Sequence, residues 1–313
     1  MANNVQSVTM TLDGNTYNLT SLDGITWTAQ FQAPAGSSYN LTNGKYNATI
    51  TAAYETGGTT TVSGSGSDAL SQKARLAVYE QIKPTANVTT PTANAYYTNS
   101  TQTLDFTIVD NGTQASGYSG VKLSTLAVTL SSVSLSESRS YGSSDFTSAA
   151  VTGGYRFTKS VTLDDALDWV MTIDCEDNDG NAMNTVTIPF RVDTVAPLLS
   201  VSSPVNNLKT NTMPITVAGT TDADSLTVTV DGGSPTAITV TSGSFNTTLN
   251  LSTQGEHVLV FTASDLAGNT TTVSRTITYS TASPTITDIS FSPDPAAAGS
   301  VGTITVTVVP YET

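Results

Sequence analysis

The sequence predicts an all-β protein that is built from tandem β-sandwich domains. Apolar and polar residues alternate over short segments, and Gly, Asn and Pro mark turns between these segments roughly every 8–12 residues. Residues 198–279 show this pattern most completely. Seven strands are expected there, at residues 198–202, 213–219, 225–231, 235–241, 244–250, 257–265 and 270–279.

The order and spacing of these strands are typical of an immunoglobulin-like sandwich. Short linkers that contain proline divide the rest of the chain, at residues 83–85, 193–197 and 280–284. The predicted fold class is therefore tandem immunoglobulin-like β-sandwich domains with incomplete sandwich units at both termini. Four parts are expected: an Ig-like unit lacking its first two strands (1–83), an enlarged Ig-like domain (84–196), a complete seven-strand domain (197–282) and a two-strand C-terminal segment (283–313).

The first unit aligns with the complete unit from the third strand onward. Residues 8–14 read VTMTLDG, which resembles LTVTVDG at residues 226–232, and Trp27 then takes the place of Phe245. The first unit is therefore expected to hold strands three to seven, with Trp27 in its core. Only residues 67–77 could form a short helix, and a loop is the alternative there.

The C-terminal segment matches the two strands that the first unit lacks. Residues 285–291 and 302–309 correspond to the first two strands of the complete unit, and Ser292-Pro293 stands where Ser203-Pro204 stands. A sandwich without two strands leaves a sheet edge and one side of its core open. One hypothesis is that residues 284–313 complete the first unit of another copy, or of the same chain. The alternatives are a self-sufficient first unit with an appendage, or a different partner protein.

Charge and hydropathy exclude two classes of partner. The formal net charge is −14, so nucleic acid and anionic membranes would be repelled. No apolar run is long enough to cross a bilayer, and the first residues lack the basic and apolar regions of a secretory signal. These features predict a virion protein that is assembled in the host cytoplasm and released by lysis, with a cell-surface location as the alternative.

Residues suited to catalysis are scarce. His257 is the only histidine and Cys175 the only cysteine, and no nucleophile motif accompanies them. Cys175 alternates with apolar residues and is expected to be a small buried strand residue, so no intrachain disulfide is expected. The sequence predicts no catalytic residues and no enzyme.

A cluster of acidic residues near the end of the second unit suggests calcium. Calcium prefers hard, clustered oxygen ligands. Residues 177–181 resemble the opening of a calcium loop, but the downstream glutamate of such loops is absent, so a solvated polar turn is the alternative. No cofactor is otherwise expected. The candidate ligands are Asp174, Glu176, Asp177, Asp179 and the linker residue Asp193.

The second unit also carries two segments rich in Tyr, Ser and Gly, at residues 111–120 and 137–146. Binding loops use this mixture, because the aromatic ring supplies contact area and the small residues supply adaptability. These segments are expected to be surface loops, and the alternative is that they bind a host-surface glycan. The candidate binding residues are Tyr118, Arg139, Tyr141, Tyr96 and Tyr97.

The linker Asp193-Thr194-Val195-Ala196-Pro197 and the turn sequence at residues 263–269 resemble those of bacterial Ig-like repeats. Such repeats occur in phage and prophage tail or virion proteins and in bacterial surface adhesins. The resemblance implies a structural or adhesive module without shared catalytic residues. Two hypotheses follow. The first is a phage virion structural protein, tail- or baseplate-associated or a decoration protein, that assembles with other copies or other virion proteins. The second is a host-surface or carbohydrate-binding adhesin.

Overall fold

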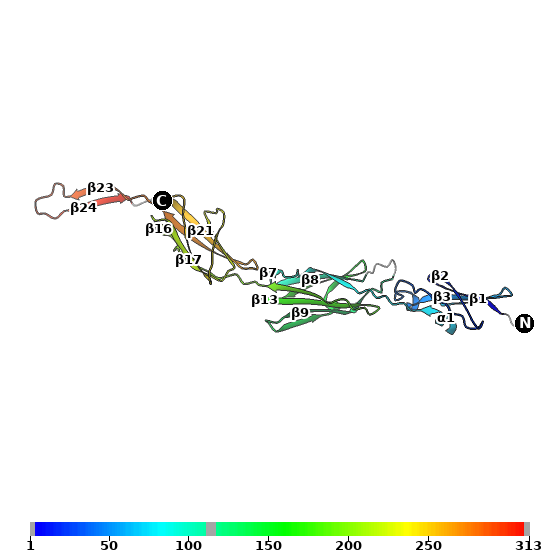
Figure 1. Cartoon of the computed structure of the whole chain (residues 1–313). Coiled ribbons are helices and arrows are strands. Elements are labelled where there is room, and N and C mark those ends of the chain that lie inside the picture. Colours follow the sequence, from blue (N-terminus) through cyan, green and yellow to red (C-terminus); the bar gives the residue numbers. More distant parts are fainter. Residues whose placement is uncertain (1–3, 111–116, 310–313) are drawn as a thin grey trace. The chain divides into compact units, whose positions relative to one another are not determined.

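The computed structural model describes residues 4–110 and 117–309, and the regular secondary structure of these residues is almost entirely β-strand (Figure 1). The predicted all-β class of tandem Ig-like sandwiches is confirmed. The chain divides into two compact units, Met1–Ala95 with Asn99–Val192, and Tyr96–Thr98 with Asp193–Thr313. The four finer parts expected from the sequence stay a prediction.

One sheet, here called the first sheet, forms the N-terminal part of the first compact unit. Its strand order is β2-β1-β3-β4, and β5 pairs with the far end of β3. A short helix lies within the segment where one was expected, because the Asp68 carboxylate accepts hydrogen bonds from the N–H groups of Leu70 and Ser71 at its first turn. The elements are β1 (Val5–Leu12), β2 (Asn15–Leu19), η1 (Thr42–Gly44), β3 (Tyr46–Tyr54), β4 (Thr59–Ser63), α1 (Ala69–Lys73) and β5 (Arg75–Leu76).

The expectation for Trp27 is wrong. Its segment forms no strand beyond an isolated bridge between Thr20 and Thr28, and the Trp27 side chain is half-exposed. In the third sandwich, described below, the matching strand at residues 244–249 pairs only with the strand at residues 215–221, which itself pairs with the strand at residues 199–203. Residues 4–83 contain no counterpart of that strand pair, so the backbone around Trp27 has no neighbouring strand to pair with.

The second sandwich completes the first compact unit. One sheet contains β10-β9-β13-β14 and the other β11-β12-β8-β6. Large apolar side chains between them, such as Trp169, Phe106 and Phe157, are fully buried. The elements are β6 (Thr85–Thr90), β8 (Thr101–Val109), β9 (Val121–Ser132), β10 (Glu137–Tyr141), η2 (Ser143–Asp145), β11 (Thr147–Val151), β12 (Gly154–Thr162), β13 (Ala166–Asp177) and β14 (Val186–Val192).

The third sandwich lies in the second compact unit, which also includes β7 (Tyr96–Tyr97). Its sheets are β15-β17-β20 and β16-β22-β21-β18-β19. All seven segments predicted as strands hold one, and β16, which pairs parallel to β22, was missed. The strands are β15 (Leu199–Ser203), β16 (Leu208–Thr210), β17 (Ile215–Thr221), β18 (Ser225–Val230), β19 (Thr236–Ile238), β20 (Ser244–Leu249), β21 (Gly255–Ser264) and β22 (Thr270–Tyr279).

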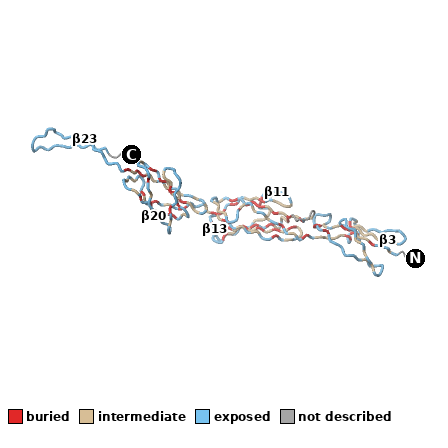
Figure 2. The backbone as a smooth tube through the Cα atoms, turned by 45° about the horizontal axis from the view of Figure 1, so that its top comes forward, coloured by how far each residue is buried: buried red, intermediate tan, exposed pale blue. Residues whose placement is uncertain are grey.

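The last two strands, β23 (Thr285–Ser292) and β24 (Thr303–Val309), pair only with each other. Every residue of both strands is exposed, as the continuous pale blue of this segment shows (Figure 2). The two predicted strands are therefore present as a hairpin that packs on no other described element of its own chain. An isolated two-stranded hairpin is marginally stable in water.

Candidate functional site

The hairpin is amphipathic. Residues directly opposite each other in an antiparallel pair point to the same face, and three cross-strand pairs on one face are entirely apolar: Ile286–Val308, Ile289–Val306 and Phe291–Ile304. These six side chains, here called the hairpin face, are 43% to 61% exposed. The opposite face carries Asp288–Thr307, Ser290–Thr305 and Ser292–Thr303. One side of the hairpin therefore has the composition of a core surface.

The first sheet has the same strand register as one sheet of the third sandwich. Met10 pairs with Ile50 as Val228 pairs with Phe261. The neighbouring pairs agree as well, since Val8–Ala52 matches Leu226–Ala263 and Ile50–Val62 matches Phe261–Val273. The predicted alignment of residues 8–14 with 226–232 therefore describes equivalent strands.

The two equivalent sheets differ in how well their inner faces are covered. In the third sandwich Val228 is 3% exposed and Phe261 is fully buried, because the sheet β15-β17-β20 packs over them. The equivalent residues Met10 and Ile50 are half-buried, whereas Val8, Leu12 and Ala48 on the same side are buried. We call the inner side of β1 and β3 the first-sheet face. Residues 4–83 form no strand pair that corresponds to β15–β17, and the face is incompletely covered at Met10 and Ile50.

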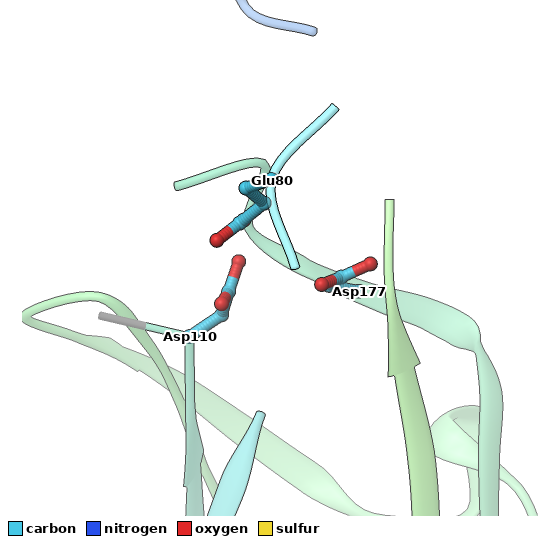
Figure 3. Close-up of side chains that lie close together, drawn as sticks. All are labelled: Glu80, Asp110 and Asp177. Atoms are coloured by element: carbon cyan, nitrogen blue, oxygen red, sulfur yellow. The ribbon is translucent and has the colours of Figure 1, made fainter. Parts of the chain in front are cut away.

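A second candidate site is a buried group of carboxylates in the first compact unit, here called the acidic centre (Figure 3). Asp110 follows the last residue of β8, Asp177 ends β13, and Glu80 comes from the segment before the second sandwich. Glu80 is 7% exposed, and Asp110 and Asp177 are fully buried. One oxygen of each residue lies within 4.8 Å of the others.

Backbone N–H groups fix these carboxylates. Ser119 donates to Glu80 Oε1 at 2.6 Å, and Gly120 donates to Asp110 Oδ2 at 2.6 Å. Asp177 accepts from the backbone and the side-chain amide of Asn181 at 2.8 and 2.7 Å. The other oxygens, Glu80 Oε2 and Asp110 Oδ1, are buried without a hydrogen-bond partner.

The charge of this centre is not balanced from within. Burial raises the pKa of Asp110 to about 6; the Gly120 N–H opposes this shift, and repulsion from Glu80 and Asp177 adds to it. Ion pairs in the described part of the chain include Lys122–Glu176, Arg139–Glu137, Arg156–Asp105 and His257–Asp231, and none of these four involves the acidic centre. A buried cluster of like charges is costly unless a cation or protons offset it.

The acidic centre overlaps only partly with the predicted calcium ligands. Asp177 belongs to it, and Asp179 adjoins it, since Asp179 Oδ2 accepts from the Glu80 N–H at 2.9 Å. Asp174 and Glu176 are not brought in. Strand alternation places them on the other face of β13 from Asp177.

The outward-facing acids have partners of their own. Asp174 accepts from Thr185 Oγ1, and Glu176 pairs with Lys122 at 3.5 Å. Asp193 belongs to the second compact unit, where it accepts from the Val195 N–H at 3.2 Å.

The predicted binding residues also separate. Tyr118 is 40% exposed and borders a pocket with Asn40, Gly153 and Tyr155. Residues 111–116 of its predicted loop lie outside the described residues. Tyr96 and Tyr97 form β7 and are half-buried.

Residues 137–146 are not the predicted loop, because β10 and η2 occupy them. Arg139 lies over the Trp169 ring at 5.7 Å, and Tyr141 lies under the Lys159 ammonium at 4.9 Å. Arg139 and Tyr141 therefore each make a cation–π contact within the second sandwich.

His257 and Cys175 take structural positions. His257 Nδ1 lies 2.7 Å from Asp231 Oδ2, and Nε2 lies 2.9 Å from the Thr253 carbonyl oxygen. Cys175 is a buried strand residue, as predicted, and burial raises the pKa of its thiol. Neither residue lies in an arrangement suited to nucleophilic attack. No helix among the described residues is long and apolar enough to cross a membrane.

The fold defines this chain as a protein of tandem Ig-like sandwiches. Residues 197–281 match the family model of glucodextranase, domain B. No curated protein matches the chain. The match to the glucodextranase model covers the third sandwich, so it concerns one domain and not the whole chain.

Among solved structures, similar chains include fibronectin(III)-like modules of Clostridium thermocellum CbhA (13% identity, 62% of this chain and 94% of that chain, TM-score 0.34). Domains A168–A170 of titin are similar at 9% identity, over 87% of this chain and 88% of that chain, with a TM-score of 0.40. A structure concerning host cell surface retention of a 1.5-MDa bacterial ice-binding adhesin is similar at 16% identity, over 88% and 86%, with a TM-score of 0.29. At these values the similarities carry no inference about function.

Proposed function

We propose that this chain is a structural protein whose copies join head to tail, with the hairpin face of one copy packed on the first-sheet face of the next. The observation that carries the proposal is the complementarity of these two surfaces. The first-sheet face has the register of a complete sandwich but is incompletely covered at Met10 and Ile50, and the hairpin offers an uncovered apolar face on two strands.

The energy available from this contact is substantial. The six residues of the hairpin face are exposed by about half, so burying each of them stabilises the contact by about 1 kcal/mol. Their sum is about 6 kcal/mol, and main-chain hydrogen bonds along a sheet edge would add to it.

A donor from another copy makes the contact heterologous, and such contacts close into rings or extend as filaments. This geometry suits a component of a repeating particle. We include in the proposal the virion role that the sequence suggested, in a phage tail, a baseplate or a decoration layer. The partners would then be other copies of the chain or neighbouring virion proteins.

Light scattering of the full chain beside a chain that ends at Ser283 tests this proposal. Both strands that the truncation removes are fully exposed, so we expect both sandwich cores to stay intact. We expect the full chain to form oligomers whose mass grows with concentration and the truncated chain to be a monomer. Two monomers would contradict head-to-tail assembly. If the truncation also lowered the melting temperature, closure of the chain on itself would be the better account.

A second candidate function is carbohydrate binding at a cell surface. It is favoured by the exposed ring of Tyr118 beside a pocket that Asn40, Asn178 and Tyr155 help to line, because aromatic rings with nearby polar groups suit sugars. Glycan-array binding should be lost in Tyr118→Ala and kept in Tyr79→Ala, whose side chain is exposed outside this pocket. Equal binding by both variants would reject this site.

A further inference from the structure

We propose that the acidic centre binds one calcium ion, with ligand oxygens from Glu80, Asp110 and Asp177. The site differs from the one that the sequence suggested, because two of its three residues come from outside the segment 174–181. It does not depend on head-to-tail assembly, since all three residues lie in the first compact unit of one chain.

Two buried oxygens point to a ligand. Glu80 Oε2 and Asp110 Oδ1 have no hydrogen-bond partner, although each side chain is more than nine-tenths buried. Buried carboxylate oxygens are normally hydrogen-bonded, paired with a cation or bound to a metal. Figure 3 shows the Glu80 and Asp110 carboxylates facing each other with Asp177 beside them. A cation among these groups would satisfy both orphaned oxygens at once.

The arrangement is preorganised for a metal. The Ser119 N–H holds Glu80 Oε1, and the Gly120 N–H holds Asp110 Oδ2. Glu80 Oε2 and Asp110 Oδ1 are thereby left free to coordinate an ion. The ligand atoms lie within 4.8 Å of one another, which is close enough for one calcium ion with bonds to oxygen of about 2.3–2.6 Å. Magnesium keeps several of its waters and is usually bound through one or two carboxylates, so three buried carboxylates favour calcium.

The ion would clamp a connecting segment onto the second sandwich. Glu80 already joins this sandwich through its backbone: its N–H donates to Asp179 Oδ2, and its carbonyl accepts from the Asn181 side chain at 3.1 Å. Calcium would add a link from the same residue to the ends of β8 and β13. It would thereby hold the segment after the first sheet in a fixed position against the second sandwich.

Calorimetric titration of the chelator-treated full chain with calcium chloride tests this site. We expect about one ion per chain and at least tenfold weaker binding in Asp110→Asn. Glu176→Gln is the matched control, because it removes a nearby carboxylate that pairs with Lys122 outside the centre. This control should bind calcium as the unaltered chain does. Magnesium should bind at least tenfold more weakly than calcium.

Thermal unfolding gives an independent readout. Asp110→Asn removes one of three buried like charges, so in chelator it should melt at or above the temperature of the unaltered chain, and calcium should raise only the latter. If Asp110→Asn does not fold, Glu80→Gln serves for the same comparison. Absence of calcium binding at millimolar concentration, equal loss of binding in Glu176→Gln, or equal affinity for magnesium would overturn the proposal.

Discussion

Truncation of Phe291 to alanine should weaken the association of copies. Phe291 is 61% exposed and pairs with Ile304 on the hairpin face. Complete burial of a Phe side chain stabilises by about 1.5–3 kcal/mol, so burial of the exposed part accounts for about 1–2 kcal/mol. The dissociation constant should therefore rise about fivefold to thirtyfold. Sedimentation velocity over a concentration series measures this change.

Ser290→Ala is the control for this variant. Ser290 is the preceding residue of β23, but it points to the polar face opposite Thr305. Its substitution should leave the dissociation constant unchanged. Equal weakening by Ser290→Ala and Phe291→Ala would refute the assignment of the apolar face as the docking surface.

Association should also strengthen with added salt, because each copy carries a formal charge of −14 and salt screens their repulsion.

Three further predictions concern the sandwiches. Burial lowers the pKa of His257, but hydrogen bonds to Asp231 and Thr253 outweigh it and raise the pKa above its ordinary value of 6.5. The stabilisation is therefore full below pH 6.5 and is lost as the pH rises through the folded pKa; His257→Gln should flatten this dependence of the melting temperature, and an unchanged slope would contradict it. Gly219→Ala should destabilise by about 1–3 kcal/mol in urea, because the added Cβ would lie 2.0 Å from the Ser200 carbonyl oxygen; a neutral effect would contradict this close contact. Trp169→Phe should lower the free energy of unfolding by about 1–3 kcal/mol, because it removes buried volume and the hydrogen bond to the Asp164 carbonyl. A decrease of less than about 0.5 kcal/mol would contradict this prediction.

The sequence was sufficient for most strands because their alternation reflects a local property of the backbone. The alignment of residues 8–14 with 226–232 also predicted the correct pairing register, because the inward-facing positions of both strands are apolar. Trp27 was misplaced for a tertiary reason. A strand there needs a neighbouring strand, and the alternating pattern around Trp27 cannot show whether one is present.

Of the three residues of the acidic centre, only Asp177 could be predicted as a ligand from the sequence. Asp177 stood out in an acidic run, but Glu80 and Asp110 are single acids in unremarkable segments. Their proximity arises from the meeting of a strand end, a connecting segment and a turn. Alternation along β13 could have separated Asp177 from Asp174 and Glu176, because Asp177 continues the buried series of Ile173 and Cys175.

A mixing experiment with two blocked variants tests the central claim most directly. Phe291→Glu places a charge on the hairpin face, and Met10→Glu places one on the first-sheet face, so each variant alone should be a monomer. Both should keep the melting behaviour of the two sandwich cores. Mixed in equal amounts, they should form a 1:1 dimer that grows no further, because only one intact contact remains per pair. A mixture that stays monomeric, or a Met10→Glu chain that associates with itself, would contradict head-to-tail assembly.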